Sequence, residues 1–202
     1  MANDFQNMVT PPGVAVYPHL TTPDTKFDAN GVYKVSLSLT EEEAAPLIER
    51  VEQVQEEATG MIPPGKRQKL SDPPYYDEMD DQGQPTGRVI FKFKMKAKVN
   101  TKDGRTLEMS PKLFDAEGTL MTDVESIWGG SVLRISADLI PFYVAAVGAG
   151  VSLRLKAVQI IDLKTGGGAG AESYGFEATK GYVAPQAEEL VEAEFAADAE
   201  DF

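Results

Sequence analysis

Residues 88–99 read RVIFKFKMKAKV, and the alternation in this stretch decides the fold. From Phe91 onward every second residue is apolar, and each residue between is a lysine. Successive side chains of a β-strand point to opposite faces, so this spacing predicts a strand with its apolar side chains in a core. The opposite face then carries four lysines in a row: Lys92, Lys94, Lys96 and Lys98.

This row of like charges indicates a partner. The lysines repel one another, at a cost that is modest in water and is offset when an anionic polymer lies across them. The segment from Arg88 to Lys112 carries eight basic and two acidic residues, a local charge of +6. The row therefore favours nucleic acid as the partner. The alternative is a solvated strand face that lysine keeps soluble.

The rest of the chain up to residue 164 predicts a mainly β fold, a small barrel or sandwich with one added helix. Apolar alternation or short apolar runs between turn residues indicate further strands at 13–19, 31–39, 105–114, 132–140 and 151–163. We expect these strands to build a single core, since a chain of this length can bury one.

One helix is expected over residues 41–59. Thr40 and Glu43 have the spacing of a capping box, and an apolar stripe follows at helical spacing: Leu47, Val51, Val54 and Ala58. The proline-rich stretch 61–87 shows no sustained period and is expected to be one long loop. It is either an arm that reaches a partner or a solvated surface.

The net charge of −13 over 202 residues is unevenly distributed. Residues 165–185 are rich in Gly and Ala and predict a flexible linker between a domain over 1–164 and a tail over 186–202. The tail has no basic residues and ends in an aromatic residue, which is typical of a partner-binding segment. Its seven acidic residues and its last residue are the candidates for partner binding: Glu188, Glu189, Glu192, Glu194, Asp198, Glu200, Asp201 and Phe202. The negative total does not exclude a nucleic-acid partner, because salt screens charges beyond about 10 Å.

Catalytic and metal chemistry find little support in the residues. The absence of cysteine excludes thiol nucleophiles, disulfides and Cys-ligated zinc, and His19 is the only histidine. A nuclease that holds magnesium with Asp77, Asp80 and Asp81 is an enzyme alternative. We expect instead a protein that is not an enzyme, with no catalytic residues, no metal and no cofactor.

Targeting signals are equally scarce. No stretch approaches the roughly 18 consecutive apolar residues of a membrane span, and the first residues lack the basic and apolar regions of a signal peptide. We therefore expect a cytoplasmic protein without a membrane partner.

Four aromatic residues near the basic strands are candidates for stacking unpaired bases: Tyr33, Trp128, Phe142 and Tyr143. Phe142 and Tyr143 follow Pro141, and strand alternation would place one ring inward and the other outward. Each of them, taken alone, is more often a core residue than a stacking platform. An acidic structural or scaffold protein that does not bind DNA is the alternative function.

Several segments, in the same order over nearly the whole chain, match one known family. They are GVYKV at 31–35, FKFK at 91–94, the run from Asp115 through MTDV at 121–124 to GGS at 129–131, LIPFYVAAVGAGVSLRL at 139–155, GGG at 166–168 and the terminal DF. On these residues the chain resembles the single-stranded-DNA-binding proteins of T7-like bacteriophages.

The resemblance implies an OB-fold barrel with an added helix, which binds single-stranded DNA without sequence preference in phage replication, recombination and repair and anneals complementary strands. It also implies a homodimer in the cytoplasm of the infected bacterium, whose tail recruits the phage DNA polymerase and primase-helicase. Phosphate-binding positions of the family fall on Lys92, Lys94 and Arg134, and its stacking aromatic falls on Phe142. Three family positions are lost at Asn30, Ser136 and Val144, which implies a shifted DNA path that uses Lys96 and Lys98.

Overall fold

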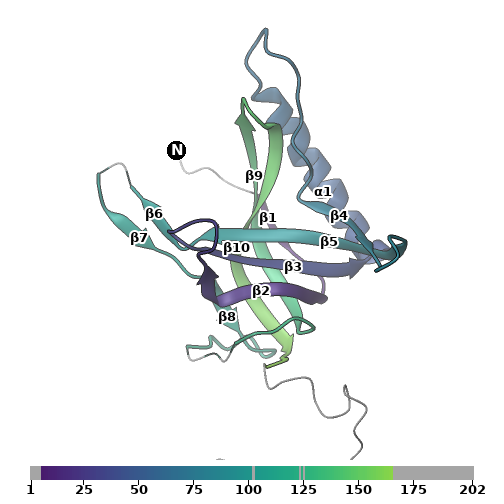
Figure 1. Ribbon diagram of the computed structural model, residues 1–202, viewed down its shortest axis with the longest axis vertical. Coiled ribbons are helices and arrows are strands. Elements are labelled where there is room, and N and C mark those ends of the chain that lie inside the picture. The colour runs from purple at the N-terminus through teal and green to yellow at the C-terminus, as the bar shows by residue number, and fades with distance from the viewer. Residues whose placement is uncertain (1–5, 102, 123, 125, 166–202) are drawn as a thin grey trace, which may run out of the picture. The chain divides into compact units, whose positions relative to one another are not determined.

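The computed structural model describes residues 6–101, 103–122, 124 and 126–165. They form one helix and a set of strands, drawn in Figure 1. The helix α1 spans Glu41–Gly60, and the strands are β1 (Gln6–Val9), β2 (Gly13–Asp24), β3 (Val32–Thr40), β4 (Tyr75–Met79), β5 (Pro85–Lys96), β6 (Lys98–Asn100), β7 (Thr106–Glu108), β8 (Lys112–Phe114), β9 (Val132–Val144) and β10 (Gly148–Asp162).

Five of these strands close a barrel. Strand β2 pairs with β3, β3 with β5, β5 with β10, β10 with β9, and β9 with β2 again. All of these pairs are antiparallel except β5 with β10, which is parallel. Numbered along the chain, the barrel strands follow the order 1-2-3-5-4-1, which is the circuit of an OB-fold. The predicted OB-fold barrel with one added helix is therefore confirmed (Figure 1).

The alternation in β5 builds the centre of the core. Phe91 and Phe93 are fully buried, while Lys92, Lys94 and Lys96 between and beyond them are exposed. Apart from Val54 of α1, the other large, fully buried side chains come from β3, β9 and β10: Val35, Leu37, Leu39, Leu133, Ile135, Leu139, Leu153, Leu155 and Val158. The period of two that the sequence shows is thus the division between core and surface.

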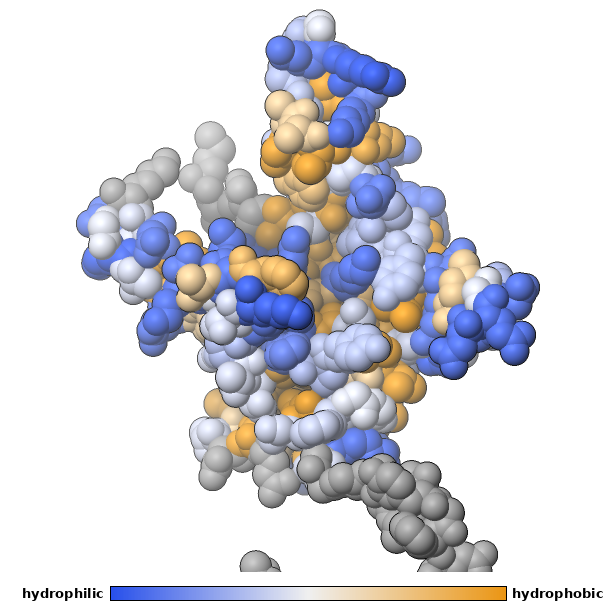
Figure 2. Space-filling view, viewed as in Figure 1, coloured by the Kyte–Doolittle hydropathy of each residue, from blue (hydrophilic) through white to orange (hydrophobic). Residues whose placement is uncertain are grey.

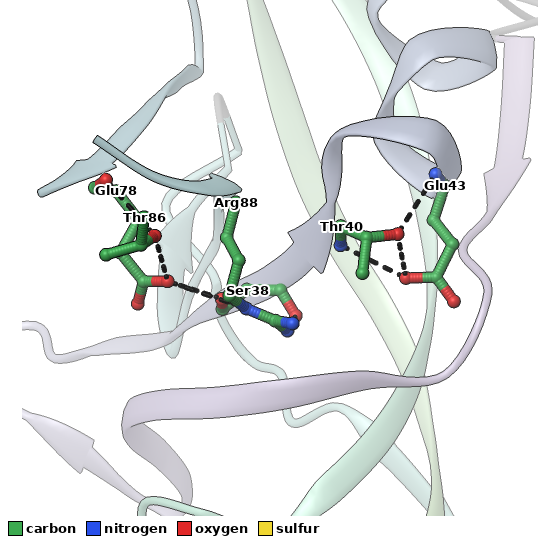
Figure 3. A network of polar contacts seen from close by, with 6 residues as sticks. All are labelled: Ser38, Thr40, Glu43, Glu78, Thr86 and Arg88. Atoms are coloured by element: carbon green, nitrogen blue, oxygen red, sulfur yellow. Dashed lines mark hydrogen bonds and ion pairs between the residues drawn. The ribbon is translucent and has the colours of Figure 1, made fainter.

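Helix α1 begins and packs as its sequence predicts. The Thr40 hydroxyl accepts a hydrogen bond from the Glu43 amide, and the Glu43 carboxylate accepts one from the Thr40 amide (Figure 3). This capping box satisfies amides that have no partner within the helix. The helix packs against β9 and β10. Ala44 is buried together with the four residues of the predicted stripe: Leu47, Val51, Val54 and Ala58.

The prediction of one long loop over 61–87 is wrong. Strand β4 lies inside it and pairs with β5, whose own start at Pro85 also falls within the predicted loop. A tight turn joins the two strands, where the Asp80 carboxylate accepts the amides of Gln82 and Gln84. Strand β4 is hard to recognise in the sequence because Pro73 and Pro74 directly precede Tyr75, and prolines argue against a strand.

A polar network fastens β4 to the barrel. Ser38 of β3 donates to the Glu78 carboxylate of β4 at 3.1 Å, and Arg88 of β5 donates to the Ser38 hydroxyl at 2.7 Å. The hydroxyl of Thr86 donates to the same Glu78 carboxylate (Figure 3). Three strands that are separate in the sequence are therefore tied together at this edge.

Two further strand predictions need correction. The expected strand over 105–114 is two strands, since β7 pairs with β6 in a separate two-stranded sheet and β8 pairs with β10. Pro111, which has no amide to donate, lies between them. The strand at 88–99 also ends at Lys96, because the Ala97 amide donates to Gly31 and the Ala97 carbonyl accepts from Met109. Lys98 therefore belongs to the β6–β7 hairpin and not to the row on β5.

Helix α1 is not long and apolar enough to cross a membrane, and no other helix occurs among the residues described. The predicted linker and tail, residues 165–202, lie outside the described residues except for Thr165.

Candidate nucleic-acid interface

A groove of about 600 Å³ lies where the segment 69–74 passes over β5 and β10. It brings Lys92 and Lys94 of β5 together with Phe142 of β9, and Lys69 and Ser71 of the covering segment line its other wall. We call it the lysine groove. Figure 2 shows hydrophilic side chains over the middle of the face where β5 and β3 run. Two of the predicted phosphate-binding residues and one predicted stacking residue thus meet in one open feature of the surface.

Backbone hydrogen bonds hold the covering segment in place. The Ala149 amide donates to the Lys69 carbonyl at 2.9 Å, and the Ser71 amide donates to the Ala149 carbonyl at 2.8 Å. Farther along, the Lys92 amide donates to the Pro74 carbonyl at 2.8 Å. The wall of the groove is therefore joined to both strands of its floor.

Two glycines of β10 allow this close approach. A Cβ atom at Gly148 would lie 2.4 Å from the Lys69 carbonyl oxygen, and one at Gly150 would lie 1.8 Å from the Ser71 hydroxyl. Gly150 is also the cross-strand partner of Phe142, whose ring atom Cζ would lie 2.8 Å from the added Cβ. The absence of side chains at these positions makes room for both the segment and the ring.

Cations on the strands that flank β5 have acidic partners. Lys94 lies opposite Lys34 on β3 and beside Arg154 on β10. Lys34 pairs with Asp24 at 2.5 Å, and the buried Asp138 pairs with Arg154 at 2.8 Å and with Lys156 at 2.9 Å. These carboxylates reduce the repulsion that a sheet face so rich in cations would otherwise suffer.

The lysine row itself differs. Among the residues described, Lys92, Lys94 and Lys96 form no ion pair with a carboxylate. Lys92 instead holds its ammonium group 4.4 Å from the centroid of the Tyr76 ring. Three exposed positive charges on one strand are thereby left for an anionic ligand.

The carboxyl group of Asp138 is held in its charged form. Burial alone would raise the pKa of Asp138, but hydrogen bonds from Arg154 and Lys156 outweigh it and lower the pKa below its ordinary value. Asp138 therefore stays ionised at neutral pH and orients two cations of β10 beside the row.

The structure does not gather all of the predicted site residues. Lys98 pairs with Glu108 at 3.2 Å in the β6–β7 hairpin. Arg134 donates to the Thr10 carbonyl and lines a different hollow, eight residues along β9 from Phe142, so roughly 26 Å of strand separates them. Trp128 also lies in another hollow, beside β2.

Phe142 and Tyr143 are neighbours on β9 and both are half-buried, so their burial does not distinguish an inward ring from an outward one. Only Phe142 lines the groove. Tyr33 packs partly buried against the core, and His19 is exposed on β2, as expected of a surface histidine.

Sequence reasoning missed three residues around the groove: Lys69, Ser71 and Tyr76. All three lie in the stretch that was expected to be one long loop. Gly148 and Gly150, two residues apart in a strand, are the signal that another segment approaches closely there. Within the described part of the chain, no three acidic or histidine side chains cluster as metal ligands.

Comparison with known proteins decides the family. The family model described as "Single-stranded DNA-binding protein, Bacteriophage T7" matches residues 13–163, which include the whole barrel. The chain belongs to this family. Its relatives include the single-stranded DNA-binding protein of Escherichia phage T7, 32% identical over 76% of this chain and 72% of the relative. The protein of the same name from Enterobacteria phage T3 is 29% identical over 82% of this chain and 79% of the relative.

Solved structures of similar proteins agree with the assigned fold. The crystal structure of gp2.5, a single-stranded DNA-binding protein encoded by bacteriophage T7, covers 79% of this chain and 93% of its own, with a TM-score of 0.67 and 28% identity. The single-stranded DNA-binding protein from bacteriophage Enc34 in complex with ssDNA covers 80% of this chain and 89% of its own, with a TM-score of 0.55 and 16% identity. At that identity the second likeness concerns the fold alone.

Proposed function

We propose that this member of the family binds single-stranded DNA without sequence preference, with the lysine groove as its main binding surface. One observation carries the proposal: Lys92 and Lys94 share an open groove with the Phe142 ring. The ammonium groups neutralise phosphates, and the ring stacks a base. Every base has a face that stacks, so binding through these contacts tolerates any sequence.

The phosphate track extends from the groove to Lys96 and then to Lys98 of the β6–β7 hairpin. Tyr143 stacks a base only at the outer end of β9, where its ring is half exposed. Arg134 and Trp128 lie in other hollows, so they contact DNA only if the strand continues past the groove.

We further propose that the protein acts in phage DNA replication, recombination and repair, in the cytoplasm of the infected bacterium. There it coats and anneals single strands as a binding protein and not as an enzyme. Family membership supports this role, together with the names of the T7 and T3 relatives.

The proposed organisation is a DNA-binding domain over 1–164, a linker over 165–185 and an interaction tail over 186–202, in a homodimer. The acidic tail recruits the phage polymerase and primase-helicase. As a polyanion the tail also competes with DNA for the lysine groove. Deleting residues 186–202 should therefore tighten DNA binding, and it should abolish recruitment of the polymerase and primase-helicase. Unchanged affinity after the deletion would exclude the competition.

Titration of a labelled oligo-dT at low salt tests the binding surface. The double variant Lys92→Glu/Lys94→Glu should lose most of its affinity while its thermal unfolding stays cooperative. Lys112→Glu is the matched control, since Lys112 is an exposed strand lysine outside the lysine groove. Loss of affinity in the double variant alone supports the proposal. If the wild-type protein shows no affinity for the oligonucleotide, an acidic scaffold protein becomes the better explanation.

A further inference from the structure

A second hollow, of about 780 Å³, lies between β2 and the segment 126–130. Two aromatic side chains at its edge are unusually exposed: Tyr17 at 83% and Trp128 at 54%. Val14, Val16 and His19 line it as well. Burying rings of this size contributes strongly to folding, so rings left in water on an open hollow indicate a surface that receives a ligand.

The backbone at Tyr17 supports this interpretation. Tyr17 has a φ of +48°, in the left-handed region that bulky side chains rarely adopt. It lies in a β-bulge, because two residues of β2 between Val16 and His19, Tyr17 and Pro18, face the single residue Val35 of β3 between Ser36 and Lys34. A bulge redirects a side chain, and strained conformations gather at functional positions.

The hollow beside β2 is connected through β3 to the lysine row on β5. His19 of β2 lies opposite Lys34 of β3 in the sheet, and Lys34 lies opposite Lys94 of β5. One step along the sheet, Val16 pairs with Ser36, and Ser36 pairs with Lys92. Neighbouring strands lie about 4.8 Å apart, so roughly 10 Å of sheet separates β5 from β2. Of the acidic residues near this route, Asp24 forms an ion pair with Lys34, and Asp72 lines the lysine groove where the route begins.

We propose that this hollow is a second base-binding subsite, in which Tyr17 and Trp128 stack unpaired bases of the same DNA strand that occupies the lysine groove. The strand crosses the sheet from Phe142 over Lys94 and Lys34 to His19 and the two rings. This inference rests on the proposed function and extends it, because a strand seated only in the groove would not reach β2. Phosphates lie along the lysines in the middle of the path, and bases stack at both ends.

The chain carries its own reporter for this subsite, since Trp128 is its only tryptophan. Oligo-dT is titrated into the full-length protein while two signals are followed: anisotropy of a label on the oligonucleotide and emission of Trp128. Both signals should change with the same midpoint. Trp128→Ala and Tyr17→Ala should each weaken binding by roughly 5- to 150-fold, the range expected for loss of one stacked base. The salt slope should stay unchanged, because no phosphate contact is removed.

Trp128→Phe, which keeps a stacking ring, should retain most of the affinity. Leu120→Ala is the matched control, because it removes an exposed apolar side chain outside both features. Binding by anisotropy without a change in Trp128 emission, and with wild-type affinity in both alanine variants, overturns the subsite while the proposed function stands. Absence of binding by anisotropy instead contradicts the proposed function. A change in the sedimentation of free protein on Trp128→Ala would make the hollow a contact between copies of this chain and would also overturn the subsite.

Discussion

The ammonium nitrogen of Lys92 lies 4.4 Å from the centroid of the Tyr76 ring. Lys92, a central residue of the lysine groove, is therefore in contact with a strand that the sequence did not predict. Tyr76 belongs to β4, and β4 pairs with β5 beside the lysine row. A cation over an aromatic face is attracted by the electrons of the ring. Tyr76 thereby restricts the position of Lys92 without neutralising its charge, as a carboxylate would.

We predict that Tyr76→Ala weakens oligo-dT binding by about two- to fivefold, since exposed cation–π contacts contribute about 0.5–1 kcal/mol. Tyr76→Phe should bind like the wild type, because it keeps the ring. Anisotropy titration at fixed salt measures both variants. Equal losses in Tyr76→Ala and Tyr76→Phe would show that the hydroxyl, and not the ring, is what matters.

A second prediction concerns Gly150. Its replacement by alanine places a methyl group where Ser71 and the Phe142 ring now lie. We expect a loss of stability of about 1–3 kcal/mol from overpacking, together with weaker DNA binding because the groove is distorted. Gly60→Ala is the control, since a Cβ at that helix position would meet nothing within 4 Å. A Gly150→Ala protein with wild-type stability and affinity would contradict the packing of segment 69–74 described above.

Asp138 gives a prediction for pH. Its pKa is lowered in the folded protein, so its contribution to stability is complete above the unfolded value of about 3.9 and is lost as the pH falls through the folded value. We expect Asp138→Asn to cost about 2 kcal/mol at pH 7, as for hydrogen bonds to a charged group, and the difference from wild type to shrink below about pH 4.

Urea unfolding at pH 7 and at pH 3 measures this difference. Asp162→Asn is the control, because it removes an exposed ion pair with Lys164 that should contribute less than about 1 kcal/mol. A cost in Asp138→Asn that stays constant down to pH 3 would argue against the ionised carboxylate as its source.

The capping box at Thr40 predicts a stability effect without a binding effect. Thr40→Ala removes the acceptor for the Glu43 amide and should destabilise the protein by about 1 kcal/mol. Glu42→Gln, which changes an acidic residue of the same turn outside the box, should cost less. Thermal unfolding measures both variants, and oligo-dT affinity should be unchanged. An affinity loss in Thr40→Ala would mean that the start of α1 affects the DNA-binding face.

The sequence alone predicts the parts of this fold that rest on local periodicity. The alternation around Phe91 and Phe93 predicts β5 and its exposed lysines, and the Thr40 capping box predicts where α1 begins. It does not predict that β5 lies parallel to β10, because this pairing joins Phe93 to Leu153 across 60 residues and no local pattern encodes it.

The site divides in the same way. Lys92, Lys94 and Phe142 are predictable as residue types in strands, and the lysine groove unites them. The place of Tyr76 beside Lys92 is not predictable, because Pro73 and Pro74 argue against the strand that carries it. The sequence also does not predict that Trp128 lies outside the groove, since only the closed barrel determines which residues become neighbours.

The salt dependence of oligo-dT binding tests the central claim most directly, because it reports how many phosphates the protein neutralises. We predict that the logarithm of the binding constant falls linearly with the logarithm of salt concentration, by about 0.7 for each phosphate contacted. Replacing Lys92, Lys94 and Lys96 together by alanine should reduce the magnitude of that slope by about 2. A slope that is the same in the wild-type and triple-variant proteins would contradict the assignment of the lysine row as the DNA-binding surface.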